Sequence, residues 1–188
     1  MDKKVYILLA EGFELIEALS PLDVLRRGHI HVETVSLNDG LEVKSAQKVT
    51  VVADRRFNID ELTDGDMIIL PGGYPGYVNL KENKDVVSLV KYYLEKNDKY
   101  VGAICGAPSL LGENKFILGR KFTCHSSVLD AMDKKMYSHM DVVRDGNLIT
   151  ASGAGHGVEF GMELAKVFLD EKSIENIMKG MELHKEEK

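Results

Sequence analysis

The sequence predicts a single α/β domain with a doubly wound, mostly parallel sheet covered by helices on both faces. Its 188 residues are enough for one continuous core. The continuous apolar run over residues 5–10 and the predicted strand 66–70, which is apolar after Asp66, are typical of strands buried on both faces of a parallel sheet. Segments with a helical spacing of apolar residues alternate with such runs, which favours this topology. Because we find no internal repeat or linker, residues 1–188 are predicted to form one domain with a frayed, charged tail at 185–188.

The first half of the chain starts with the buried strand at 5–10 and continues with a helix over 14–27. Leucine and alanine side chains recur on one face of this helix, and Gly28 is expected to end it. Pro21 lies inside the pattern, so the helix is either kinked there or restarts with Ser20 as its cap.

The remaining elements follow from short apolar runs and from helical periodicity. Alternating residues around a short break predict a hairpin on the edge of the sheet, formed by 41–46 and 48–52. The strand at 66–70 ends abruptly at a Pro-Gly-Gly sequence, residues 71–73. The other predicted strands cover 30–37, 100–104, 121–124 and 147–151, and the other predicted helices cover 86–95, 158–169 and 173–181.

The composition excludes several classes of protein. The formal net charge is -6 and no stripe of Lys and Arg is interleaved with aromatic residues, so we expect no nucleic acid partner. Two cysteines without a repeated spacing predict neither a disulfide framework nor a zinc site, which fits a reducing compartment. The first apolar run ends at Glu11, which argues against a signal peptide, and no run approaches the roughly 20 residues of a membrane span. We therefore expect a cytoplasmic protein with no membrane partner, no metal and no other cofactor.

Cys105 lies where the predicted strand 100–104 turns directly into a helix. In open α/β sheets, functional sites form beyond the carboxyl ends of the strands. Small residues flank the cysteine and leave room for a tight turn, and Pro108 suits a first helical turn. This pattern resembles a nucleophile elbow, in which a strained backbone projects one reactive side chain. The helix dipole is expected to favour the thiolate of Cys105, whereas the plainer interpretation is a small buried hydrophobe.

Two further stretches end strands at the same edge of the predicted sheet. Gly72 and Gly73 allow backbone N–H groups to approach a ligand closely, as an oxyanion hole requires, although such a pair is more often an ordinary turn. Glu11, Glu14 and Glu17 follow the first strand, and the first two are expected to serve the helix dipole in solvent. Glu17 has apolar neighbours in the sequence, so its carboxyl is either partly buried or solvated.

Two histidines are candidates for the same edge of the sheet. His125 follows the predicted strand that ends in Cys124, and His156 lies in a glycine-rich turn before a predicted helix. A histidine is more often structural than catalytic, so the residue pattern alone assigns neither of them a role.

Together, these stretches resemble the ThiJ/PfpI superfamily, and most closely its parkinsonism-associated deglycase and glyoxalase III-like subgroup. The similarity runs nearly end to end and rests on residues 10–17, 21–27, 70–73, 103–108 and 123–125. Each segment alone is a weak signal, and the set is specific. One departure is Gly106, which follows the cysteine where the protease-like branch of the superfamily carries a histidine.

The resemblance implies a flavodoxin-like sandwich and a homodimer. It also implies a reactive cysteine, Cys105, paired with a protonated glutamic acid, Glu17, whose neutral carboxyl donates a hydrogen bond to the thiolate. His125 falls on the family's nearby histidine. The amides of Gly73 and Gly106 fall where the family places its oxyanion donors.

Three functions are compatible with such a site. The leading hypothesis is a cofactor-independent glyoxalase or deglycase for small 2-oxoaldehydes, in which Cys105 forms a hemithioacetal while Glu17 and His125 shuttle protons. The second is a redox sensor or holdase chaperone of oxidative stress with little turnover, because an accessible, activated thiol is suited to controlled oxidation. The third is an amidase or peptidase that uses Cys105 with His156.

Overall fold

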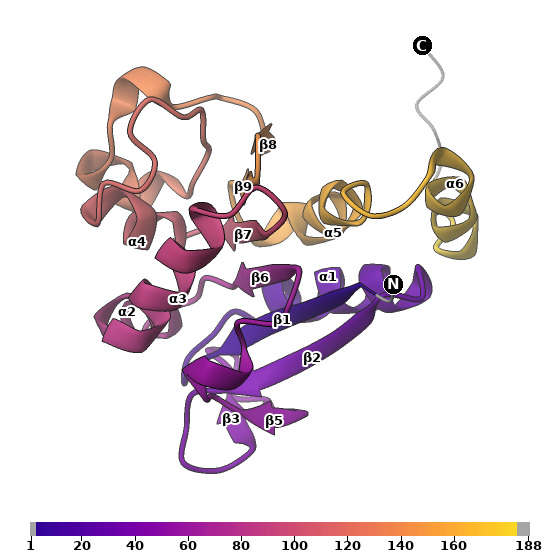
Figure 1. Ribbon diagram of the computed structural model, residues 1–188, viewed down its shortest axis with the longest axis horizontal. Helices are drawn as coiled ribbons and strands as arrows, with labels where there is room; N and C mark the ends of the chain where they lie inside the picture. The colour runs from indigo at the N-terminus through magenta and orange to yellow at the C-terminus, as the bar shows by residue number, and fades with distance from the viewer. Residues whose placement is uncertain (1–2, 184–188) are drawn as a thin grey trace.

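The computed structural model describes residues 3–183 and contains a seven-stranded sheet between two layers of helices (Figure 1). Neighbouring strands are parallel except for the last pair, which is antiparallel. In spatial order the strands are β5 (Arg55–Arg56), β2 (His31–Ser36), β1 (Lys4–Leu9), β6 (Met67–Leu70), β7 (Tyr100–Ile104), β9 (Leu148–Ala151) and β8 (Val142–Asp145). The chain order reverses between β1 and β6, as in a flavodoxin-like sheet. The predicted fold class is confirmed.

The two helical layers bury opposite faces of the sheet. Side chains of β1 alternate between them: Val5 and Ile7 belong to one apolar cluster, while Tyr6 and Leu8 belong to the other. This is why the first strand is a continuous apolar run. The helices of the first cluster are α1 (Leu15–Arg27), α5 (Gly157–Ala165) and α6 (Glu171–Gly180), and those of the second are α2 (Gly76–Glu82), α3 (Lys84–Leu94) and α4 (Pro108–Glu113).

Two predicted β segments are corrected by the structure. The hairpin forms as β3 (Glu42–Lys44) and β4 (Thr50–Val52), but it is a separate two-stranded sheet. Its main chain attaches to the loop after β1, where the N–H of Gly12 donates to Lys44, so it does not extend the edge of the main sheet. The predicted strand at 121–124 is wrong, because only Phe122 forms an isolated bridge and the N–H of Thr123 donates to a side chain. Sequence analysis also missed α2, β5 and β8.

The observed helix boundaries are closer to the predicted ones than those of the two β segments. Helix α1 runs through Pro21 as one element, so the restart at Ser20 does not occur, and Gly28 is its C-cap as predicted. Helix α5 ends at Ala165, earlier than the predicted 169. The predicted frayed tail at 185–188 lies outside the described residues. The single domain over 1–188, the cytoplasmic location and the homodimer stay predictions.

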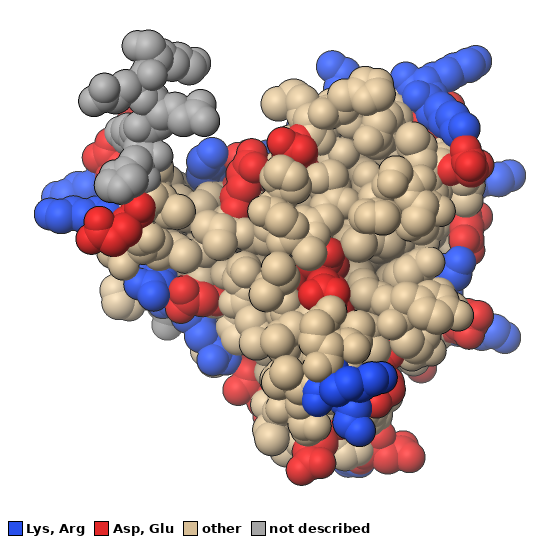
Figure 2. Space-filling model, turned by 180° about the vertical axis from the view of Figure 1, so that it is seen from behind, with Lys and Arg blue, Asp and Glu red and all other residues tan. Residues whose placement is uncertain are grey.

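The surface shows no concentration of positive charge on the face drawn in Figure 2. Most lysine and arginine side chains lie along the edges of that face, a small group lies on its lower part, and its centre consists of uncharged residues around a small acidic group. Of the helices within residues 3–183, none combines the length and the hydropathy that a bilayer span requires.

Helices α1 and α5 pack closely because two glycines of α5 face α1. A Cβ atom on Gly157 would lie 3.0 Å from the carbonyl oxygen of Ile16, and one on Gly161 would lie 2.9 Å from the Cα atom of Pro21. The two glycines are four residues apart and therefore share one face of the helix. This contact fixes α1, which carries Glu17, against its neighbour.

Replacement of Gly161 tests this packing. Gly161→Val is expected to lower the free energy of unfolding by about 1–3 kcal/mol, because the contacted atoms include backbone that cannot rotate away. The measurement is urea denaturation followed by circular dichroism. Gly40→Val is the matched control, since a Cβ atom there meets nothing within 4 Å. Equal midpoints for the two variants would show that the close approach of α1 and α5 is dispensable.

Candidate active site

Cys105 sits in a sharp turn between β7 and α4. Its φ of 64° lies in the left-handed region, which side-chain-bearing residues rarely adopt. The N–H of Cys105 donates to the carbonyl of Ala151 at 2.9 Å, and its carbonyl accepts from the N–H of His125 at 2.9 Å. Pro108 occupies the first turn of α4. The strained strand-to-helix turn is confirmed, and main-chain hydrogen bonds to two other segments hold it.

Two backbone amides converge on the Cys105 sulfur. The N–H groups of Gly73 and Gly106 lie close enough to it to lower the pKa of the thiol. Gly73 has a φ of 88°, and a Cβ atom there would lie 2.2 Å from the amide nitrogen of Glu14, so only glycine fits. The structure therefore brings together both amides that the family resemblance assigned as oxyanion donors. The cysteine itself is half-buried.

Glu17 lies buried beside the cysteine. Its carboxyl and the Cys105 thiol are within hydrogen-bonding reach of one another. Oε2 accepts a hydrogen bond from the N–H of Gly72 at 2.8 Å, whereas the buried Oε1 has no partner of ordinary geometry among the described residues. A Cβ atom on Gly72 would lie 2.6 Å from Oε2 and 2.7 Å from the Cβ atom of Cys105. Glycine at position 72 therefore allows the acid and the thiol to meet.

Burial changes the titration of both groups. It raises the pKa of Glu17 to about 7, against the hydrogen bonds from Cys105 and Gly72. Burial also raises the pKa of Cys105 to about 12 and the charge of ionised Glu17 adds to this, while the amides of Gly73 and Gly106 lower it. Desolvation thus opposes the lowering of the Cys105 pKa that the helix dipole was predicted to cause. Since two adjacent buried anions repel, the pair keeps at least one proton near neutral pH.

The surrounding donors favour the negative charge on sulfur and the proton on Glu17. The sulfur has two amides close to it and is partly exposed, whereas the fully buried carboxyl has one donor, and its Oε1 has no hydrogen-bond partner within residues 3–183. A protonated Oε1 can donate to the sulfur, which satisfies the orphan oxygen. Once Glu17 carries the proton, it no longer raises the pKa of the thiol by charge. These donors favour a thiolate paired with a neutral acid, whereas the two raised pKa values taken alone favour an ionised Glu17 beside a thiol, and the alkylation experiment below distinguishes the two states.

Glu11 and Glu14 hold the β3–β4 hairpin against the loop after β1, a role that sequence analysis missed. A carboxylate oxygen of Glu11 accepts from the N–H of Lys44 at 3.1 Å. The carboxylate of Glu14 accepts from the side-chain N–H of Gln47 at 2.5 Å, and Gln47 Oε1 accepts from the N–H of Leu15 at 3.2 Å. These partners are 32 or 33 residues apart, so no local sequence pattern indicates them.

His125 lies next to Cys105 through the main-chain hydrogen bond between them. Its ring nitrogen Nδ1 is 2.8 Å from the hydroxyl oxygen of Ser127, and the same nitrogen accepts from the N–H of Ser127. The imidazole is exposed and lies near Gly153. The position beside the cysteine agrees with the resemblance, and its role in proton transfer stays a prediction.

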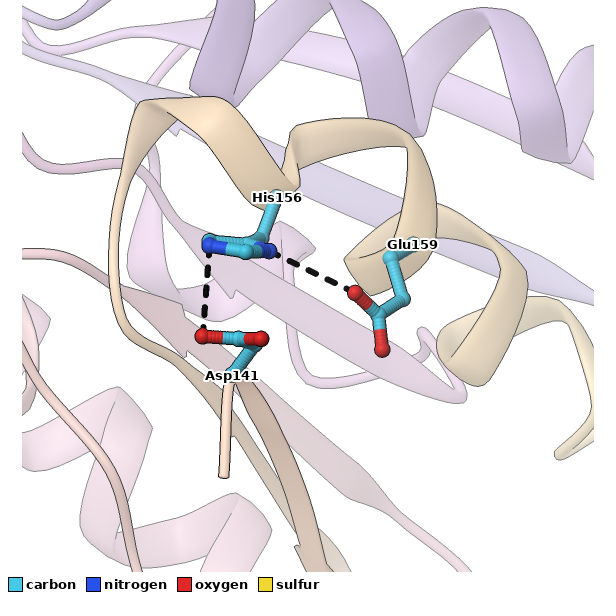
Figure 3. A group of neighbouring side chains, drawn as sticks. All are labelled: Asp141, His156 and Glu159. Atoms are coloured by element: carbon cyan, nitrogen blue, oxygen red, sulfur yellow. Dashed lines mark hydrogen bonds and ion pairs between the residues drawn. The ribbon is translucent and has the colours of Figure 1, made fainter. Parts of the chain in front are cut away.

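His156 belongs to a different cluster (Figure 3). Its Nε2 lies 3.2 Å from a carboxylate oxygen of Asp141, and its Nδ1 lies 3.4 Å from one of Glu159. Both ring nitrogens thus face carboxylates, and neither is available to Cys105 in this arrangement. One ring nitrogen of His156 and one oxygen of each carboxylate lie within 4.8 Å of one another. The pairing of Cys105 with His156, on which the amidase alternative depends, is not observed.

Comparisons with known proteins agree on one family. The DJ-1/PfpI family model matches residues 3–167. Protein dj-1beta of Drosophila melanogaster is 32% identical over 184 residues, which cover 96% of this chain and 97% of the fly protein. Glutathione-independent glyoxalase DJ-1 of Schizosaccharomyces pombe is 29% identical over 170 residues, 86% of this chain and 88% of that protein.

Structural similarity agrees with the sequence matches. A DJ-1 superfamily protein from Salmonella typhimurium has a TM-score of 0.90 and 33% identity, with 97% of this chain and 100% of that chain covered. Protein DJ-1 homolog B of Arabidopsis thaliana is 32% identical, but the match spans only 40% of its length. The family similarity therefore covers nearly all of this chain, while some relatives are much longer.

The location of the shared proton is tested by the pH dependence of Cys105 alkylation. Glu17→Gln keeps a neutral donor, so the pKa of Cys105 should stay close to the wild-type value. Glu17→Ala removes the donor and should raise the pKa by about one to two pH units, the equivalent of one hydrogen bond to a charged group. Iodoacetamide labelling read by peptide mass spectrometry reports this. A fall in the pKa on Glu17→Ala would instead place the proton on sulfur, because the change would have removed a repelling carboxylate.

Proposed function

Since the chain belongs to the DJ-1/PfpI family, we propose that it is a cofactor-independent enzyme that converts small 2-oxoaldehydes to 2-hydroxy acids through Cys105. The observation that carries the proposal is the position of the buried Glu17 carboxyl beside the half-buried Cys105, with Gly72 packed between them and Cys105 held in a left-handed turn. Such a site combines a nucleophile, a proton carrier and oxyanion donors. The relative from Schizosaccharomyces pombe that is named a glutathione-independent glyoxalase supports the same reaction class.

The first step forms a carbon–sulfur bond. The Cys105 thiolate adds to the aldehyde carbon, and the carbonyl electron pair moves to oxygen, which takes the proton from Glu17. This produces a neutral hemithioacetal and leaves Glu17 as a carboxylate. Until the proton arrives, the developing negative charge on oxygen is stabilised by backbone N–H groups at the turn.

The next steps move hydrogen within the substrate. The Glu17 carboxylate removes the proton from the former aldehyde carbon, and the neighbouring carbonyl oxygen takes a proton from His125 to form an enediol. Return of the Glu17 proton to the second carbon and loss of the first hydroxyl proton to His125 produce the thioester of a 2-hydroxy acid. Water then releases the acid and restores the thiolate, and its proton goes to Glu17. One carbon is oxidised and its neighbour is reduced, so the reaction balances without an external oxidant.

The proposal predicts lactate formation from methylglyoxal in the absence of glutathione. Cys105→Ser should abolish this reaction, whereas Cys124→Ser should retain it provided that the fold is intact, since Cys124 is buried in the core. Glu17→Gln should lower kcat by about 10²–10⁴-fold, because glutamine donates a hydrogen bond but cannot exchange a proton with substrate. Iodoacetamide should still alkylate Cys105 in this variant. Lactate is measured enzymatically after quenching. Equal rates for wild type and Cys105→Ser would refute the proposal.

A second candidate function, redox sensing, is favoured by the contrast between the two cysteines. Cys105 is half-buried and lies beside Glu17 and the amides of Gly73 and Gly106, which would hold a sulfinate, whereas Cys124 is only 1% exposed. Peroxide would supply one oxygen in each of two steps, first to a sulfenic and then to a sulfinic acid.

Mild hydrogen peroxide should therefore add two oxygen atoms to Cys105 and leave Cys124 unmodified. Intact-mass and peptide mass spectrometry of the folded protein measure both sites. Glu17→Ala should slow the oxidation, because fewer Cys105 side chains are then thiolate at neutral pH. Oxidation of both cysteines at similar rates would contradict a tuned site and would leave turnover as the surviving function.

A further inference from the structure

Two tyrosines flank the amides that contact the Cys105 sulfur. Tyr74 directly follows Gly73, and 73% of it is exposed. Tyr77 lies in the first turn of α2 and its ring covers Gly106, where a Cβ atom would lie 2.6 Å from the ring carbon Cδ1. The two rings are in contact, with centroids 6.4 Å apart and planes inclined at 59°. An aromatic surface thus begins over the Gly106 amide and ends in solvent at Tyr74.

The loop that carries Tyr74 is fixed, although the ring itself is exposed. A Cβ atom on Gly12 would lie 2.4 Å from the Cδ atom of Pro75, so the loop after β6 packs tightly on the loop after β1. The N–H of Gly76 donates to the Gly12 carbonyl at 3.3 Å, and the N–H of Tyr77 donates to the Gly73 carbonyl at 2.9 Å. A ring presented by a rigid backbone loses little conformational freedom when it binds a ligand.

We propose that Tyr74 and Tyr77 form a binding surface for an aromatic substituent of the substrate, so that arylglyoxals are preferred to methylglyoxal. The inference rests on the proposed aldehyde chemistry at Cys105. An aldehyde carbon bonded to the sulfur, with its oxygen at the amides of Gly73 and Gly106, places its substituent close to the residues next to those amides. A phenyl ring there can contact a tyrosine at the 4.5–7 Å spacing of aromatic pairs, whereas a methyl group offers little area.

The test compares phenylglyoxal with methylglyoxal in the wild type, Tyr74→Ala and Tyr74→Phe. The ratio of kcat/KM for phenylglyoxal to kcat/KM for methylglyoxal is expected to fall about three- to tenfold in Tyr74→Ala, which corresponds to the free energy of one aromatic pair. Tyr74→Phe should retain the wild-type ratio. Leu118→Ala is the matched control, since Leu118 is a similarly exposed apolar side chain in the turn after α4. Its ratio should equal that of the wild type.

A second readout does not depend on turnover. The rates at which N-phenylmaleimide and N-ethylmaleimide alkylate Cys105 are compared in the same four proteins, and the phenyl-to-ethyl ratio should fall about three- to tenfold in Tyr74→Ala alone. If the wild type turns over neither aldehyde, the proposed function fails and this ratio still decides the aromatic surface. Ratios that are identical in wild type and Tyr74→Ala in the maleimide assay would overturn the inference, whatever the aldehyde kinetics show.

Discussion

The contact between the Glu17 carboxyl and the Cys105 thiol is the interaction on which the chemistry of this protein depends. Each group is acidic, each has a pKa raised by burial, and their charges repel when both are ionised. A proton shared between them removes this charge repulsion, and the pKa of Cys105 then depends on the protonation of Glu17. The pair is therefore a coupled unit, in which the carboxyl decides how much of the cysteine is thiolate.

Backbone geometry makes this contact possible. Gly72 leaves space between the acid and the thiol, and the positive φ of Gly73 directs an amide to the sulfur. The left-handed turn at Cys105 is held by the carbonyl of Ala151 and the amide of His125, which come from two other parts of the chain. The loop after β6, the turn after β7 and the segment that carries His125 therefore build the site together at the carboxyl edge of the sheet. The hydrogen bonds around Cys105 offset its backbone strain.

The two candidate functions use the same physical features. Aldehyde turnover needs a thiolate, a proton carrier and oxyanion donors, while selective oxidation needs a thiolate and groups that hold the oxidised sulfur. They differ in whether Glu17 must exchange a proton or only donate a hydrogen bond, which glutamine can also do. The amidase alternative has less support, since His156 bridges two carboxylates away from the cysteine.

The sequence by itself determined the features that depend on local pattern. Continuous apolar runs identified the central strands, and the small residues around Cys105 identified the sharp turn, because period, size and backbone freedom are properties of neighbouring residues. Only the tertiary structure decided the burial of Glu17, its contact with Gly72, the partners of Glu11 and Glu14, and the true position of the hairpin. Those features join residues 32 to 55 positions apart, and desolvation depends on everything packed around a group. For the same reason the desolvation of Cys105, which opposes the effect of the local helix dipole on its pKa, followed only from the assembled core.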